Sequence, residues 1–200
     1  MYGKRMRETM LAIKGVKKAL DLNDLQSKSK IKASISQSKY IELTRGSIYE
    51  WGIPWMNYGR IVVVRMIASL NKDEWVLWCH GDTNSSLNHE SFIAHGINPD
   101  TFRIAYSNKP MKDLRAAILS PKFKFIVIDS AVDLNDISLA FLHHKAKELK
   151  KIILIIRPYY LSSKKGCVWS KLRFNVEQKK MHEEITIRGI KGHRNYSVDS

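Results

Sequence analysis

Short apolar runs, separated by segments with helical signals, fill the middle of the chain. The runs that have the length of buried strands are residues 48–51, 75–79, 102–106, 123–128 and 152–156. The segments with helical spacing or with helix start and stop residues are 59–70, 86–95, 111–119 and 137–150. The strands are nearly continuous in apolar residues, which is typical of strands buried on both faces. This alternation predicts an α/β fold with a mostly parallel sheet flanked by helices.

Before this core, residues 4–20 place apolar side chains at helical spacing, with Lys and Arg between them. The pattern predicts a basic amphipathic helix. Residues 21–40 are rich in Ser, Lys, Asn and Gln, and they indicate a linker. We therefore assign residues 1–45 to a basic N-terminal helix and linker. Whether this helix docks on its own domain, docks on a partner or mediates self-association stays open.

Toward the other end, residues 167–176 and 184–190 alternate apolar and polar positions. Such alternation predicts C-terminal antiparallel strands that extend the sheet. The core domain then covers residues 46–200. A chain of 200 residues suits one domain of this kind with an additional N-terminal arm.

The net charge of +15 is concentrated toward the two ends of the chain. Residues 1–45 contain 11 basic and 4 acidic residues, a net charge of +7. Residues 46–144 contain 9 basic and 10 acidic residues, a net charge of −1. Residues 145–200 contain 14 basic and 5 acidic residues, a net charge of +9. This distribution indicates a polyanionic partner, and DNA is the partner we expect.

Composition also narrows the cellular setting. No apolar run approaches the length of a membrane span. The two cysteines, Cys79 and Cys167, form no disulfide framework and suit a reducing compartment. We expect a cytoplasmic protein with no membrane partner, associated with the nucleoid where it binds DNA.

Residues 48–61 look like the strand, loop and helix start of a P-loop whose reactive residues are missing. In the working motif, G-x-x-x-x-G-K-[ST], backbone N–H groups and the Lys hold phosphates and the hydroxyl holds Mg²⁺. Here Gly52 and Gly59 are separated by six residues rather than four. Arg60 stands in the place of the Lys, and Ile61 stands in the place of the hydroxyl.

The strand at residues 123–128 ends in Asp129 and Ser130, and this resembles the Walker B strand of RecA-type recombinases. Residues 59–70 and 75–80 are similar to the helix after the RecA P-loop and the strand that follows it. Further similar segments, in chain order, are residues 94–105, 152–156, 169–176 and 185–192. The resemblance covers residues 45–195 and implies a RecA-like fold.

Within that superfamily, the small size and the degenerate P-loop are similar to ImuA-type and SulA-type proteins of the bacterial DNA-damage (SOS) response. ImuA-type members accompany a Y-family translesion polymerase, and SulA-type members block the division protein FtsZ. RecA's water-activating Glu has Asn84 in its place by one alignment, and Asp82 substitutes only if the loop shifts. The resemblance therefore implies a pseudo-ATPase, because the Lys, the hydroxyl and the Glu are all absent.

The segment after residue 156 corresponds to the second DNA-binding loop of RecA. It combines aromatic side chains, which stack on bases, with cations, which contact phosphates. The C-terminal stretch would extend the same basic face. The residues that we expect to bind nucleic acid are Arg157, Tyr159, Tyr160, Lys164, Lys165, Lys171, Arg188, Lys191 and Arg194.

A P-loop that no longer binds phosphate is free to contact protein through apolar side chains. We expect Trp55, Met56 and Tyr58 to serve this purpose. We expect no metal site: His143 and His144 lack a second pair of ligands at metal spacing. The acidic residues after the fourth strand are better explained as helix caps, by Asn135 or Asp136.

The expected function is that of a non-hydrolysing RecA-like accessory factor in bacterial DNA-damage tolerance. It would scaffold a translesion polymerase or a RecA filament near DNA, and no bound cofactor is expected. Two alternatives stay open. One is an active, ATP- and Mg²⁺-dependent recombinase-like DNA-binding ATPase, and the other is a SulA-like division inhibitor that acts on a protein partner.

Overall fold

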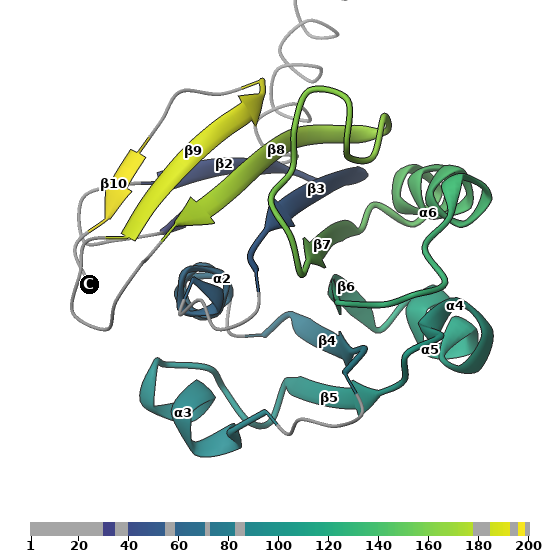
Figure 1. The fold of residues 1–200 in the computed structure, drawn as a ribbon. Coiled ribbons are helices and arrows are strands. Elements are labelled where there is room, and N and C mark those ends of the chain that lie inside the picture. Colours follow the sequence, from purple (N-terminus) through teal and green to yellow (C-terminus); the bar gives the residue numbers. More distant parts are fainter. Residues whose placement is uncertain are drawn as a thin grey trace, which may run out of the picture.

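The computed structural model describes residues 30–34, 40–54, 59–70, 73–82, 87–177, 185–192 and 196–198. Its centre is an eight-stranded sheet with the order β10-β9-β8-β3-β7-β6-β4-β5 (Figure 1). The strands are β3 (Ser47–Gly52), β4 (Trp75–His80), β5 (Phe102–Tyr106), β6 (Phe123–Asp129), β7 (Ile152–Arg157), β8 (Ser170–Glu177), β9 (Ile185–Lys191) and β10 (Tyr196–Val198).

The pairing confirms the predicted α/β class. Neighbouring strands from β5 to β8 run parallel to one another, and β8 and β9 pair antiparallel. β3 lies between β7 and β8, so the chain must cross β3 on its way from one to the other. This crossing is made by residues 158–169, named here the crossover loop, which contains no helix.

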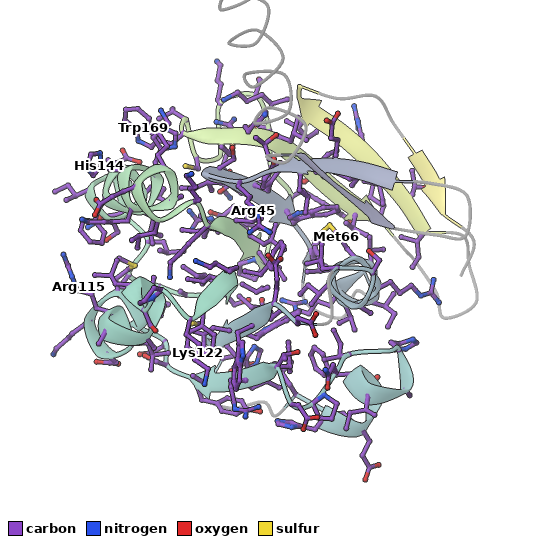
Figure 2. All side chains as sticks on the ribbon, turned by 180° about the vertical axis from the view of Figure 1, so that it is seen from behind. Arg45, Met66, Arg115, Lys122, His144 and Trp169 are labelled. Atoms are coloured by element: carbon purple, nitrogen blue, oxygen red, sulfur yellow. The ribbon has the colours of Figure 1, made fainter. Side chains whose placement is uncertain are left out.

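Helices cover both faces of the sheet and divide the core in two. One face carries α2 (Arg60–Ala68) and α3 (His89–Ala94), and the other carries α4 (Pro110–Asp113), α5 (Arg115–Leu119) and α6 (Asp136–Leu149). Figure 2 shows Met66 of α2 and Arg115 of α5 on opposite sides of the sheet. Along β6, Phe125 and Val127 pack in the α2 core, whereas Ile126 and Ile128 pack in the α6 core. The two-residue period of a strand explains why every second side chain enters the same core.

The N-terminal region differs from the predicted linker. Within residues 21–40 and just beyond, β1 (Lys30–Ser34) and β2 (Tyr40–Thr44) pair as an antiparallel hairpin. Ile41 and Leu43 are fully buried in the α2 core, and the intervening Glu42 is exposed. The hairpin packs on the same core as α2, whose consecutive residues 62–64 are all buried, so α2 has apolar neighbours on more than one side. The predicted helix at residues 4–20 lies outside the described residues.

One predicted helix also differs. The single helix predicted for residues 111–119 is divided at Leu114, whose φ of −112° is not helical. The first half is fixed to neighbouring loops, because the Ser107 hydroxyl donates to Asp113 and the Met111 N–H donates to Asp133. No helix in the described ranges is long and apolar enough to cross a membrane.

We predict that Leu43→Ala lowers the free energy of unfolding by about 2–5 kcal/mol, because it leaves a cavity beneath the hairpin. Chemical denaturation followed by circular dichroism measures the change. Glu42→Ala, on the exposed side of the same strand, is the matched control and should change stability by less than about 0.5 kcal/mol. Equal stability of the two variants would show that the hairpin is not part of the core.

Candidate functional site

The carboxyl ends of the parallel strands lie along one border of the sheet, named here the carboxyl edge. Ligands of open α/β sheets bind at this edge. β4 ends in His80 and β6 ends in Asp129, and both side chains are buried. α2 begins at Arg60, and seven residues separate it from the end of β3. The P-loop-like and Walker B-like segments therefore meet at the carboxyl edge.

Arg60 and Asp129 form a two-pronged ion pair. Arg60 Nε donates to Asp129 Oδ2 and Arg60 Nη2 donates to Asp129 Oδ1, each at 3.0 Å. Arg60 Nη2 also donates to the Ser130 hydroxyl at 3.2 Å. The Asp129 side chain is fully buried, and the Arg60 side chain is 18% exposed. This fork is the strongest geometry for an arginine–carboxylate pair, because it combines charge with two aligned hydrogen bonds.

The loops after β4 and β6 pack tightly around this pair. The Gly81 N–H donates to the Asp129 carbonyl at 2.6 Å. A Cβ on Gly81 would lie 2.5 Å from the Ser130 carbonyl oxygen, so only glycine fits there. Ser130 has a φ of +61°, a left-handed conformation that costs a non-glycine residue about 1–2 kcal/mol. Its hydroxyl donates to Asp129 Oδ1 at 2.8 Å, which helps to offset that cost.

His80 completes the surroundings of the carboxylate. Its Nδ1 lies 3.3 Å from Asp129 Oδ2, and its ring meets the edge of Tyr106 with the centroids 5.7 Å apart. Burial alone would raise the pKa of the Asp129 carboxyl. The hydrogen bonds and charge supplied by His80, Arg60 and Ser130 outweigh burial, so the pKa lies below its usual value. Asp129 is therefore a stable carboxylate at neutral pH.

Both oxygens of Asp129 have two polar neighbours each. Oδ1 accepts from Arg60 and Ser130, and Oδ2 accepts from Arg60 and lies 3.3 Å from His80 Nδ1, so a Mg²⁺ ion would compete with these groups for the carboxylate. Ile61, at the place of the metal-binding hydroxyl, packs against the α2 core. Within the described residues, no three His, Cys, Asp or Glu side chains gather as a metal site.

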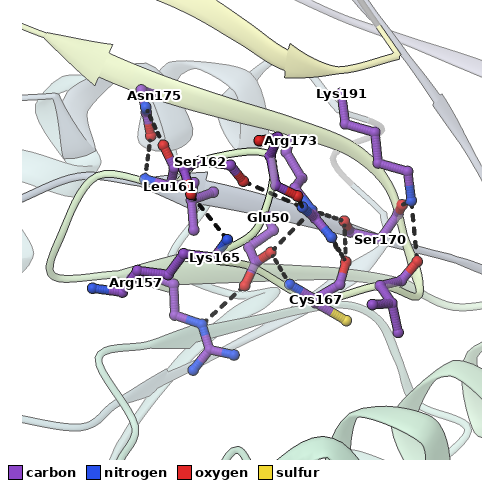
Figure 3. A network of polar contacts seen from close by, with 12 residues as sticks. Glu50, Arg157, Leu161, Ser162, Lys165, Cys167, Ser170, Arg173, Asn175 and Lys191 are labelled. Carbon is purple, nitrogen blue, oxygen red and sulfur yellow. Dashed lines mark hydrogen bonds and ion pairs between the residues drawn. The ribbon is translucent and has the colours of Figure 1, made fainter.

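A second buried carboxylate, Glu50, lies in the central strand β3 (Figure 3). Arg157 Nε donates to Glu50 Oε1 at 3.0 Å, and the Cys167 N–H donates to Glu50 Oε2 at 2.6 Å. Arg173 Nε lies 3.7 Å from the same Oε2. Arg173 Nη2 also donates to the Cys167 carbonyl at 2.7 Å. Glu50 thus fixes the far end of the crossover loop to the sheet.

The near end of the crossover loop is fixed by Asn175 of β8. The Leu161 N–H donates to Asn175 Oδ1 at 2.8 Å, and Asn175 Nδ2 donates to the Leu161 carbonyl at 3.0 Å. Gly52 allows this approach, because a Cβ there would lie 2.3 Å from Asn175 Oδ1. The first glycine of the P-loop-like segment therefore accommodates the crossover loop.

The residues expected to bind nucleic acid have different surroundings. Arg157 is held by Glu50. The ring of Tyr159 is covered by the Lys165 ammonium, whose Nζ lies 3.7 Å from the ring centroid. The residues of the set that are exposed and described are Tyr160, Lys164, Lys165, Lys171, Arg188 and Lys191.

Two of these lysines also make hydrogen bonds within the fold, one to the β1–β2 hairpin and one to the end of the crossover loop. Lys171 Nζ donates to Thr44 Oγ1 at 2.7 Å, which links β8 to β2. Lys191 Nζ donates to the carbonyls of Val168 and Ser170 at 3.0 and 2.8 Å. Both ammonium groups keep a donor for a further acceptor, since each carries three N–H bonds.

The structure also describes the residues that the sequence offered as a helix cap and as metal ligands. Asn135 is the cap of α6, because its side chain accepts from the Ser138 N–H at 2.9 Å. His144 is exposed, whereas His143 stacks on the exposed indole of Trp169. Burial raises the pKa of the Cys79 thiol to about 12. The predicted positions Trp55, Met56, Tyr58, Asn84 and Arg194 lie outside the described residues.

Sequence reasoning missed several residues of these clusters: His80, Gly81, Glu50, Arg173, Asn175 and Trp169. One signal was present, since Glu50 interrupts an apolar strand and a buried charge requires a partner. The chain matches no family model, and no curated protein is significantly similar to it.

We predict that Asp129→Asn lowers the free energy of unfolding at neutral pH by about 3 kcal/mol, because Arg60 loses its buried counter-charge. The folded-state pKa of Asp129 is depressed. The ion pair therefore stabilises the fold fully above the unfolded pKa of about 4 and is lost as pH falls through the folded value.

The unfolding free energy of Asp129→Asn should consequently fall less steeply than that of the unaltered chain as pH drops below about 4. Urea denaturation at a series of pH values measures both slopes. Asp100→Asn, in an exposed turn, is the control and should keep the original slope. If the unfolding free energies of the unaltered chain and of Asp129→Asn fall equally steeply below about pH 4, the role assigned to the ion pair is contradicted.

Proposed function

We propose that this chain is a RecA-like accessory factor in bacterial DNA-damage tolerance that does not hydrolyse nucleotide. The observation that carries the proposal is the fork between Arg60 and Asp129. It joins the residue in the place of the P-loop Lys to the residue in the place of the Walker B Asp. The positive charge that would meet a phosphate is used inside the protein.

The arrangement of elements along the chain supports the RecA-like part of the proposal. The P-loop-like segment follows β3 and leads into α2, and the Walker B-like Asp129 ends β6. The two segments resembling the C-terminal RecA strands form β8 and β9 in antiparallel pairing. This order of elements along the chain supports the RecA-like part of the proposal.

The chemistry at the carboxyl edge supports the loss of hydrolysis. Phosphoryl transfer depends on a metal ion and on cations that neutralise the developing charge on the phosphate. Here Ile61 packs into the core instead of offering a hydroxyl, and both oxygens of Asp129 accept hydrogen bonds from Arg60. Nucleotide binding would require the buried ion pair to open, at a cost of several kcal/mol.

A scaffold near DNA needs a surface for the polyanion and a surface for a protein partner. Positive charge concentrated in residues 145–200, with Lys164 and Lys165 exposed on the crossover loop, supports DNA contact. The partners implied by the resemblance are a Y-family translesion polymerase and RecA.

A SulA-like role on a protein partner is the second candidate. It is favoured by two exposed apolar residues near the carboxyl edge, Val132 and Ile137, which are 71% and 80% exposed. Both follow β6 and flank the start of α6. Apolar side chains in such positions are typical of protein-contact surfaces.

We predict that the purified chain releases no phosphate from ATP in the presence of Mg²⁺. Asp129→Ala should leave that zero rate unchanged, because the carboxylate is bound to Arg60 rather than to a metal. A malachite-green assay measures the phosphate, and a working RecA-type ATPase serves as positive control. Turnover that disappears in Asp129→Ala would overturn the proposal and favour the active ATPase.

We also predict that the chain binds DNA and that reversing both charges in Lys164→Glu/Lys165→Glu weakens binding at least tenfold, with a shallower salt dependence. Fluorescence anisotropy of a labelled oligonucleotide measures the affinity. Lys109→Glu/Lys112→Glu makes the same change of charge at two exposed lysines near α4 and is the matched control. If the chain binds no DNA but inhibits FtsZ polymerisation, the SulA-like candidate replaces the proposed scaffold.

A further inference from the structure

The crossover loop ends in two exposed apolar side chains that the fold does not use. Val168 and Trp169, just before β8, are 68% and 43% exposed. The indole of Trp169 stacks on His143 of α6, with the ring centroids 5.3 Å apart and an angle of 28° between the planes. Figure 2 shows Trp169 at the outer border of the molecule, beside the helix that carries His144. His143 thus supports the indole while a large part of the indole surface remains open to solvent.

The imidazole that supports Trp169 favours its neutral form. Burial, and then the neighbouring Lys147 and His144, lower the pKa of His143. This direction favours the uncharged ring, and the small angle between the two ring planes is that of an aromatic stack. A stack of this kind fixes the plane of the indole without placing a charge beneath it.

Three lysines belong to the elements that meet at the exposed indole. Lys147 lies one helical turn after His143, on the same face of α6. Lys191 reaches the carbonyls on both sides of Trp169, at Val168 and Ser170. Lys171 follows two residues later and is exposed. Among the described residues, no carboxylate forms a salt bridge with any of these three lysines.

We propose that Trp169 is a stacking site for a base of single-stranded nucleic acid, with Lys147, Lys171 and Lys191 contacting the adjacent phosphates. An exposed aromatic face flanked by cations is the combination that single-strand binding proteins use. This inference rests on the proposed DNA contact and gives it a definite place. It assigns base stacking to Trp169, whereas the ring of Tyr159 is covered by Lys165.

The surroundings favour a nucleic acid strand over an acidic protein segment. Among the described residues of the crossover loop, the exposed large apolar side chains are Tyr160 near its start and Val168 and Trp169 at its end, so they form no continuous apolar run. A protein helix needs a longer apolar groove to bury its apolar face. A single base needs only one aromatic plane, and a phosphate chain contacts the separate lysines in turn.

The test measures anisotropy of a labelled oligothymidylate of about 20 nucleotides with the full chain, across a range of salt concentrations. Trp169→Ala should raise the Kd by between about fivefold and a hundredfold, the loss expected for one stacked base. The slope of log K against log salt should not change, because no charge is removed. Lys147→Ala and Lys171→Ala should each reduce that slope by about 0.7.

Three controls make the test specific. Trp169→Phe keeps an aromatic ring and should retain most of the affinity. Tyr106→Ala removes an aromatic residue of similar exposure at the end of β5 and should leave Kd unchanged. An abasic oligonucleotide of equal length should bind the unaltered chain and Trp169→Ala equally, because it offers no base to stack.

The outcomes separate this inference from the proposal beneath it. If the unaltered chain binds the oligonucleotide and Trp169→Ala binds equally well, the stacking site is overturned and the DNA contact stands. If Trp169→Ala weakens binding to the abasic strand as much as to the normal one, the side chain acts structurally and the inference also fails. If the unaltered chain binds neither strand, the proposed DNA contact fails and the stacking site fails with it.

Discussion

A carboxylate that is buried at the end of a parallel strand must be matched by a positive charge, because an isolated ion in the protein interior costs several kcal/mol. Asp129 is such a carboxylate, and the chain supplies Arg60 from the first position of α2. This match ties the start of α2 to the end of β6 and sets the backbone around Ser130 and Gly81. In a nucleotide-binding site, a metal ion and phosphates would share this space with the carboxylate. Here the protein's own guanidinium provides the compensation, so the edge is stable without a ligand.

The same constraint operates a second time in the middle of the sheet. Glu50 is fully buried, and its charge is met by Arg157 and Arg173 from the strands on either side of β3. These contacts hold the crossover loop against the sheet. Because β7 and β8 run parallel, the loop must pass from the carboxyl edge to the opposite border before β8 can begin. That path carries Lys164 and Lys165 across the surface and leaves Trp169 beside α6. The exposed lysines and Trp169 therefore lie on a loop that the contacts of a buried carboxylate hold against the sheet.

Local patterns in the sequence were sufficient for most of the fold. The apolar runs at residues 75–79 and 102–106 became β4 and β5 nearly to the residue, since strands buried on both faces are continuous in apolar side chains. The cap of α6 followed from Asn135, which satisfies backbone N–H groups wherever the helix starts. The hairpin of β1 and β2 was missed, because its strands have only five residues each and β1 lies in a segment rich in Ser and Lys. Its place became clear only from the tertiary structure, in which Ile41 and Leu43 share a core with α2.

By itself, the sequence determined the α/β class, the order of strands and helices, and the concentration of positive charge near the ends. These features depend on residues close together in the chain. Tertiary structure decided which charges meet. Arg60 and Asp129 are 69 residues apart, and Glu50 and Arg157 are 107 residues apart, so no local pattern records either pair. It also placed the Lys165 ammonium over the ring of Tyr159 and left Trp169 exposed, on a loop that Glu50 and Asn175 fix to the sheet.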